Sequence, residues 1–254
     1  MLIGLFTLLT ILLGGGDATP FILPKAEKVV KQTVEDSDRK KDILAEVKIY
    51  TKEWKKLQKT KKKQAKAISK MNKDYSADHQ AIADEFQKYR DERKRLSANL
   101  TMFRLTVQEM FTEQEWSAII DQAVNLKPKK EKKLNKAQAK ELVTQDKQIG
   151  VIESEIEAAF DNSEKRELAK KDLLAFEDDM ANLLVENQSY TSTVVEVMKD
   201  QQVSQEEIEE VTNLQEKIRA EAHASFLELR KNLVEISTED NWPKLAKALG
   251  KFIK

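Results

Sequence analysis

Apolar residues recur every three or four positions along two long stretches of the chain, about residues 38–73 and 164–200. This spacing is typical of a long helix that packs along a partner helix. A returning stretch with the same period runs from Ile82 to Met110, after a short polar segment. Because short turns make consecutive helices antiparallel, the pattern predicts long helical hairpins. At about 1.5 Å per residue, each long helix would measure about 50 Å.

The two hairpins match one another when the sequence is shifted by 126 positions without a gap, from about residue 26 to residue 125. We interpret this match as an internal duplication, in which equivalent side chains pack in the same way in both copies. The equivalent positions that we expect to act as packing anchors are Trp116 and Trp242, Thr112 and Thr238, and Trp54 and Met180.

A short closing segment follows each hairpin and begins TEQEW in the first copy and TEDNW in the second. Thr112 stands three residues before Glu115, which is the spacing of a capping box. Asn241 replaces the glutamate in the second copy, and Pro243 suits the first turn of a helix. We therefore expect each tryptophan to anchor a short helix across the open end of a hairpin. An exposed tryptophan that binds a partner is the alternative.

Capping residues also mark the starts of the long helices. Ser204 and Glu207 have the spacing of a second capping box, and Ser76 is the expected N-cap of the first returning helix. The stretches EDSD and DNSE end a short helix before each hairpin and cap the helix that follows.

Polar residues interrupt the apolar seams at equivalent positions. We expect a solvated or loosely packed hairpin tip at these positions; a device that fixes the helix register, or a site for a partner chain, is the alternative. The residues are Lys61 and Asn187, Gln64 and Tyr190, and Arg93 and Arg219.

The first 24 residues differ from the rest of the chain because they begin with the uncharged, apolar run MLIGLFTLLTILLGGG. Sixteen helical residues span about 24 Å, a little less than the roughly 30 Å hydrocarbon core of a bilayer. We predict a retained single-pass membrane anchor, with a cleaved secretory signal as the alternative. Its apolar residues are Leu2, Ile3, Leu5, Phe6, Leu8, Leu9, Ile11, Leu12 and Leu13.

Basic residues follow this apolar run and none precedes it, so the positive-inside rule favours a cytoplasmic location for the rest of the protein. A periplasmic location is the close alternative. The segments that we expect are an anchor (1–24), a first hairpin unit (25–125), a basic connector (126–149) and a second hairpin unit (150–254).

The composition and the motif search reduce the number of possible functions. Lys plus Arg equals Asp plus Glu at 44 each, which argues against a protein built mainly to bind nucleic acid. The chain has no cysteine, so disulfides and thiolate chemistry are excluded. No phosphate loop, nucleophile motif or metal spacing is present. His79 and His223 are not at equivalent positions, so we do not expect either to be a ligand. We expect no enzyme activity, no cofactor, no metal and no small-molecule substrate.

The basic stretch KKLQKTKKKQAK, residues 55–66, is one candidate for chemistry. Its lysines could contact phosphates or lipid headgroups. A solvated helix face is the plainer interpretation, since the returning helix carries acidic residues that would lie nearby. The candidate phosphate or lipid contacts are Lys55, Lys56, Lys61, Lys62 and Lys63.

Two resemblances bear on function. An N-terminal anchor before tandem long-helix units resembles the membrane-anchored, spectrin-repeat-like regulators of bacterial division, which implies a cytoplasmic scaffold. FTEQEWSAI and STEDNWPKL are similar to the Leu-Thr-x-x-Gln motif of the Spy/CpxP periplasmic chaperones, which implies a hairpin that binds client proteins. Thr112 and Thr238 match its threonine. Phe111 and Ser237 depart from its leucine, and tryptophan replaces or displaces its glutamine.

The sequence therefore predicts an all-α protein with an N-terminal membrane anchor and two tandem helical hairpins. We expect a membrane-tethered structural or assembly protein that acts through long helical faces and associates with itself or with another envelope component. A periplasmic client-binding chaperone and an α-helical pore-forming protein are the alternatives.

Overall fold

A computed structural model of the chain describes residues 26–125 and 150–250. The described residues form helices joined by short connections and contain no strand, so the all-α prediction is confirmed. The helices are α2 (Ala26–Thr33), α3 (Ser37–Lys73), α4 (His79–Glu109), α5 (Glu113–Asn125), an unlabelled helix over residues 150–159, α7 (Ser163–Lys199), α8 (Gln205–Ile236) and α9 (Trp242–Leu249).

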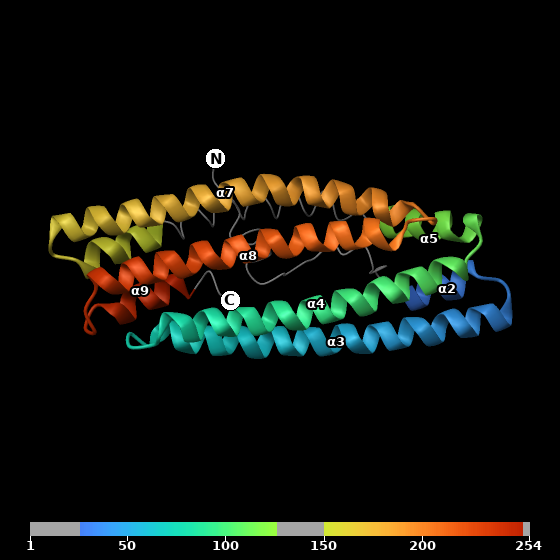
Figure 1. Cartoon of the computed structure of the whole chain (residues 1–254), viewed down its shortest axis with the longest axis horizontal. Coiled ribbons are helices and arrows are strands. Elements are labelled where there is room, and N and C mark those ends of the chain that lie inside the picture. Colours follow the sequence, from blue (N-terminus) through green and yellow to red (C-terminus); the bar gives the residue numbers. More distant parts are fainter. Residues whose placement is uncertain (1–25, 126–149, 251–254) are drawn as a thin grey trace.

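The four long helices lie side by side in the order α3, α4, α8, α7 (Figure 1). Helices α3 and α4 form one hairpin, and α7 and α8 form the other. The two hairpins meet where α4 packs on α8, and they point in opposite directions. Residues 26–125 are called half 1 below, and residues 150–250 are called half 2.

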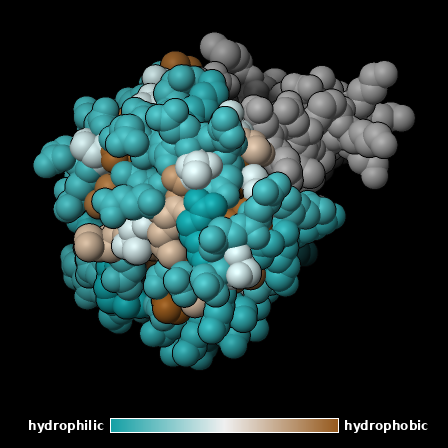
Figure 2. All heavy atoms as spheres, turned by 90° about the vertical axis from the view of Figure 1, so that its right-hand side faces the viewer, coloured by the Kyte–Doolittle hydropathy of each residue, from teal (hydrophilic) through white to brown (hydrophobic). Residues whose placement is uncertain are grey.

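The short helices pack at the two ends of this arrangement. Helix α5 of half 1 contacts α7, and α9 of half 2 contacts α3. The turn of each hairpin therefore lies against the closing helix of the other half. At the end that carries α2 and α5, the surface is mostly hydrophilic, with a few separated hydrophobic residues (Figure 2).

Buried apolar side chains fill the interior along the whole length. The largest cluster includes Met180, Phe226 and Trp242. A second cluster, at the opposite end, contains Val30 and Trp116. A third joins the two halves. Because fully burying one large apolar side chain contributes roughly 1.5–3 kcal/mol, this continuous interior stabilises all four long helices together.

Helices α3 and α7 begin and end within a residue of the predicted boundaries, whereas α4 begins three residues before the predicted Ile82. The capping box at the start of α8 is present: Glu207 N donates to Ser204 Oγ at 3.2 Å, and Ser204 N donates to a Glu207 carboxylate oxygen at 2.8 Å. The prediction for α4 is wrong, because its N-cap is Asp78, whose carboxylate accepts from Gln80 N at 3.3 Å. Ser76 instead donates to Asp74 from its backbone N and its hydroxyl.

Two predicted segments lie outside the described residues: the membrane anchor at 1–24 and the connector at 126–149. Among the helices of residues 26–125 and 150–250, none has the length and apolar character that a membrane crossing requires.

Candidate functional site

Half 1 caps the C-terminus of α7 with two side chains. The indole Nε1 of Trp116 donates to the carbonyl of Lys199, the last residue of α7, at 3.1 Å. Arg104 Nη2 donates to the carbonyl of Asp200 at 2.6 Å, and its guanidinium lies 3.9 Å from the centroid of the Trp116 ring. The last carbonyls of a helix lack partners within the helix, and a cation there complements the helix dipole. Side chains from half 1 therefore satisfy carbonyl groups at the C-terminus of α7.

Half 2 makes similar contacts to the C-terminus of α3, although its indole binds a carbonyl one position earlier, because the equivalent of Lys199 is Lys73. Trp242 Nε1 donates to the carbonyl of Asn72 at 3.1 Å, and Arg230 Nη2 donates to the carbonyl of Asp74 at 3.0 Å. The guanidinium lies 5.3 Å from the centroid of the Trp242 ring. Arg104 and Arg230 occupy equivalent positions in the shifted sequence, as do Asp200 and Asp74. These two sites are called the α7 cap and the α3 cap below.

A third hydrogen bond repeats in both caps although the donor residue changes. Gln201 Nε2 donates to the carbonyl of Phe111 at 2.8 Å. At the equivalent positions, the hydroxyl of Tyr75 donates to the carbonyl of Ser237 at 3.2 Å. An amide and a phenol thus satisfy the same backbone oxygen, which indicates that the backbone geometry of the two caps agrees.

Both cap arginines lose contact with water. Burial lowers the pKa of Arg104 to about 10, and the neighbouring Asp200 acts in the opposite direction. Burial also lowers the pKa of Arg230, against the opposing effect of Asp74. A desolvated guanidinium needs several hydrogen-bond or ring contacts to remain favourable, and the helix C-terminus and the tryptophan provide them.

The closing helices begin differently. In α5 both bonds of the capping box are present: Thr112 N donates to Glu115 Oε2 at 2.9 Å, and Glu115 N donates to Thr112 Oγ1 at 3.2 Å. Glu115 also accepts from Arg39 at 2.6 Å. Before α9, Thr238 N donates to Asn241 Oδ1 at 2.8 Å, while the Asn241 amide donates to the carbonyl of Ala159 at 3.0 Å. The second start lacks the reciprocal bond.

A buried ionic cluster lies between the halves, midway along α4 and α8. Arg93 Nε lies 3.1 Å from Glu216 Oε1, and Arg219 Nη1 lies 2.8 Å from the same oxygen. Arg93 Nη2 also donates to Gln215 Oε1 at 3.2 Å. Arg93 and Arg219 are 4% and 2% exposed, so the prediction that they lie in a solvated hairpin tip is wrong. Their burial depends on a carboxylate that belongs to only one half.

The other polar seam positions also lie inside rather than at a tip. Gln64 and Tyr190 are buried, and Lys61 and Asn187 are half-buried.

The remaining expected packing anchors differ in burial. Trp54 is half-buried and packs against the cluster between the halves, whereas Met180 is fully buried in the largest cluster.

The charge of the chain is divided unequally between the halves. Half 1 contains 22 Lys and Arg against 17 Asp and Glu, whereas half 2 contains 11 against 23. The net charge of zero for the whole chain conceals this division. Sequence reasoning missed it because charge was summed over the whole chain, and summing over each matched unit would have found it.

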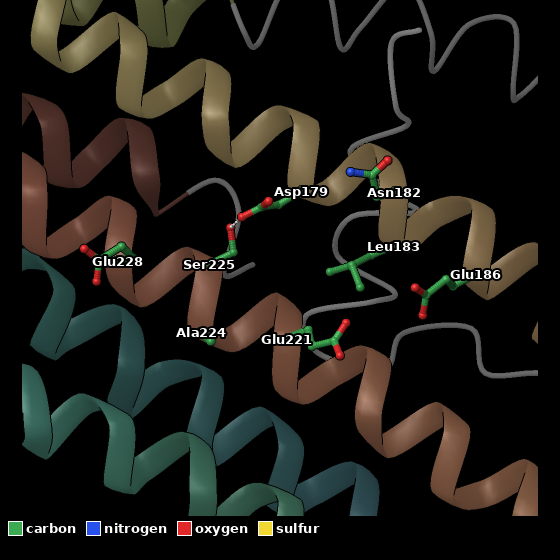
Figure 3. A pocket seen from close by; sticks show the side chains of 8 residues that line it. All are labelled: Asp179, Asn182, Leu183, Glu186, Glu221, Ala224, Ser225 and Glu228. Atoms are coloured by element: carbon green, nitrogen blue, oxygen red, sulfur yellow. Dashed lines mark hydrogen bonds between the residues drawn. The ribbon is translucent and has the colours of Figure 1, made fainter.

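The negative charge of half 2 gathers along a groove between α7 and α8. This acidic groove has a volume of about 500 Å³ (Figure 3). Ser225 Oγ donates to Asp179 Oδ2 at 2.7 Å, while Glu186 and Glu221 extend from opposite walls. The lining residues are Asp179, Asn182, Leu183, Glu186, Glu221, Ala224, Ser225 and Glu228.

The positive charge of half 1 lies mainly on α3. Six exposed lysines, called the lysine stripe below, follow one another at alternating steps of four and three residues along one face. Within the described part of the chain, none of the six forms a salt bridge. Glu92 of α4 lies near the stripe, as expected of acidic residues on the returning helix: its pKa is lowered mainly by the hydrogen bond from Arg95, with a smaller contribution from Lys56. Two candidate phosphate or lipid contacts, Lys55 and Lys62, are exposed beside the stripe, and Lys61 is half-buried. The stripe comprises Lys52, Lys56, Lys59, Lys63, Lys66 and Lys70.

The described residues define an all-α protein in which two helical hairpins cap one another and carry opposite excess charge. Comparison of the chain with protein-family models, with curated proteins and with solved structures found no match.

Proposed function

We propose that the protein is a membrane-tethered structural or assembly protein without enzyme activity, and that it binds its partner through the long faces of its helices. The observation that carries this proposal is the presence of two complementary elongated surfaces, a lysine stripe along residues 52–70 of α3 and an acidic groove between α7 and α8. Extended faces of this kind suit binding along a helix more than enclosure of a small molecule.

The caps support the same proposal because they hold the two faces in a fixed relation. Each cap joins a hairpin turn to side chains of the other half, so the hairpins cannot separate without exposing helix-end carbonyls and a tryptophan. Because an unsatisfied buried polar group costs about 1–3 kcal/mol, separation is unfavourable at both ends.

We also propose that the two halves arose by duplication of one hairpin unit. The ungapped shift of 126 positions supports this origin, and so do the two hydrogen bonds that join equivalent residues in both caps.

The proposed membrane attachment rests on the apolar run in residues 1–24. The test compares the full chain with a variant that lacks residues 2–24, both expressed at low level and fractionated. We expect the full chain to stay with membranes through a high-salt wash and an alkaline carbonate wash, and the shortened variant to be released. Recovery of the full chain in the soluble fraction, or a mature protein whose mass lacks the apolar run, would contradict the tether.

A reporter fused to the C-terminus and active on only one side of the membrane tests the second part of the proposal. Activity on the cytoplasmic side is expected from the basic residues that follow the apolar run. Suppression of aggregation of unfolded proteins by the purified chain would favour the chaperone alternative. Release of dye from vesicles would favour the pore-forming alternative.

A further inference from the structure

We propose that the partner is a second copy of this chain, whose lysine stripe docks along the acidic groove. This inference rests on the proposed assembly function and specifies its partner. It is carried by three observations: the spacing of the charges, the absence of a salt bridge to the stripe among the described residues, and the positions of the two faces.

The spacing of the charges agrees on the two surfaces. The stripe consists of two rows, each with a period of seven residues, which is about 10.5 Å along a helix. The two walls of the groove each carry two carboxylates with the same period of seven residues, and each row continues with one carboxylate beyond the groove. The lysine rows are Lys52, Lys59 and Lys66, and Lys56, Lys63 and Lys70; the groove carboxylates are Asp179 and Glu186 on α7 and Glu221 and Glu228 on α8, and the rows continue to Asp172 on α7 and Glu235 on α8. A helix laid along the groove would therefore meet a carboxylate at each repeat on both sides.

Half 2 does not neutralise its own groove. Glu221 and Glu228 each lie near a lysine one turn away on α8, at 3.7 Å and 3.3 Å. Exposed pairs of this kind contribute only about 0.3–0.5 kcal/mol each. Half 1 differs at the equivalent place, since Arg95 of α4 lies 3.8 Å from Glu53 of α3, across the two helices. Among the described side chains, no lysine or arginine of the facing helix forms a salt bridge with a groove carboxylate of half 2.

The stripe cannot reach the groove of its own molecule. Helix α3 lies at one edge of the row of long helices and α7 at the other, with α4 and α8 between them (Figure 1). A contact between stripe and groove must therefore join two molecules. Because the two surfaces are different, the contact is heterologous, and successive copies extend into a row or close into a ring.

Charge complementarity would also give the contact a strong dependence on salt. Each exposed pair is weak, but the six lysines and the four groove carboxylates, with Asp172 and Glu235 beyond them, act together and steer the encounter. At about 1 M salt the Debye length falls to roughly 3 Å, so these interactions are largely screened. Association should therefore be strong at low ionic strength and weak at high ionic strength.

The experiment measures self-association of the full chain in detergent by analytical ultracentrifugation. Three charge-reversed variants are compared with wild type: a stripe variant, a groove variant and a control. The substitutions are Lys56→Glu, Lys59→Glu and Lys63→Glu in the stripe variant; Glu186→Lys, Glu221→Lys and Glu228→Lys in the groove variant; and Lys28→Glu, Lys31→Glu and Lys41→Glu in the control. The control reverses equally exposed lysines away from the stripe.

We expect wild type and control to associate at low salt and to dissociate at about 1 M salt. The stripe variant and the groove variant should each associate at least about tenfold more weakly, a loss of roughly 1.4 kcal/mol. When the two variants are mixed, association should return, because the reversed stripe fits the reversed groove and the native stripe fits the native groove. Circular dichroism of each variant establishes that it is folded.

Three results would overturn the proposal. The first is equal association of all four proteins, and the second is failure of the two variants to associate when mixed. The third is binding of the wild-type stripe to vesicles of phosphatidylcholine and phosphatidylserine, lost in the stripe variant while self-association is unchanged, which would assign the stripe to a lipid surface. Failure of the membrane tether appears separately, as release of the wild-type chain by carbonate, whatever the association measurements give.

Discussion

Trp242 and Trp116 occupy equivalent places in the two caps, but Trp242 has no exposed surface whereas 5% of Trp116 remains exposed. Trp242 belongs to the largest apolar cluster and lies beside Tyr75, with ring centroids 6.3 Å apart. Trp116 belongs to a smaller cluster and is covered more closely by its arginine, at 3.9 Å rather than 5.3 Å. The α3 cap therefore depends more on apolar burial, and the α7 cap more on the cation above the ring.

This difference shows that similar backbone arrangements can be stabilised mainly by apolar burial in one cap and mainly by a cation–ring contact in the other. In both caps an arginine binds the carbonyl of the equivalent aspartate, and the indole binds a carbonyl of the last two residues of a helix. The main difference between the caps therefore lies in the surroundings of the two tryptophans. Paired substitutions at equivalent positions can therefore separate burial from the cation–ring contact.

The largest effect is expected when each tryptophan is replaced by alanine. Trp242→Ala should lower the free energy of unfolding by about 3–5 kcal/mol, because a fully buried aromatic ring leaves a cavity. Trp116→Ala should cost less, since its site is smaller and partly open. Urea denaturation followed by far-UV circular dichroism measures both losses, with half-buried Trp54→Ala as the control. A larger loss of unfolding free energy for Trp116→Ala than for Trp242→Ala would contradict the inference that the α3 cap depends more on apolar burial.

The arginines should show the opposite order. Lysine keeps the charge near the helix end but cannot stack a planar group on the indole. Arg104→Lys should therefore cost about 1–2 kcal/mol, as expected for a desolvated cation–ring contact, and Arg230→Lys should cost less. The same denaturation experiment measures both changes. Equal losses of unfolding free energy in the two variants would show that the distance between the guanidinium and the ring does not affect stability here.

The starts of the closing helices differ by a smaller amount. Thr112→Ala removes the hydroxyl that accepts from Glu115 N and should cost about 1 kcal/mol. Thr238→Ala should have little effect, because the bond to Asn241 comes from the Thr238 backbone N, which alanine retains. Thermal unfolding can resolve this difference, since 1 kcal/mol shifts Tm by about 2–4 °C at this chain length. A comparable shift for both variants would mean that the two starts are energetically alike.

The smallest expected effect concerns Glu177, whose equivalent in half 1 is the uncharged Thr51. Burial raises the pKa of Glu177 above its ordinary value of 4.5, and Glu153 and Asp178 add to the shift. The folded state therefore favours the protonated acid, and this stability is present below pH 4.5 and is lost as the pH rises through the folded pKa.

Glu177→Gln should consequently be slightly more stable than wild type at pH 7 and equal to it near pH 4. Denaturation at the two pH values measures the change, and Thr51→Val provides the matched change in half 1, with no pH dependence expected. A stability difference between Glu177→Gln and wild type that stays constant with pH would exclude titration of Glu177 as its cause.

The sequence predicts the helices of this protein well because each long helix carries its own signals. The period of apolar residues locates α3 and α7 to within a residue, and the pairs Ser204–Glu207 and Thr112–Glu115 locate helix starts through local hydrogen bonds. Competition among nearby polar residues explains the error at Ser76, since Asp78 also offers an acceptor, two residues closer to the helix.

The contacts between the halves could not be predicted in the same way. Periodicity shows which face of a helix is buried but not which helix covers it, so the assignment of each cap to the opposite hairpin needed the structure. Arg93 appears out of place in an apolar seam until Glu216, 123 residues later, is found beside it. Charge summed over each half would have revealed the opposite excess, but the groove itself depends on how α7 and α8 lie together.

The reciprocal caps also determine when the protein can finish folding during its synthesis. Arg230, which binds the carbonyl of Asp74, is added 156 residues after it. At about 5–20 residues per second, the ribosome needs roughly 8–30 s to make that stretch. For this interval the first turn lacks its cap, whereas the α7 cap needs residues only up to Gln201. The end of the molecule that carries the first turn therefore completes its native contacts at a later stage of translation than the opposite end.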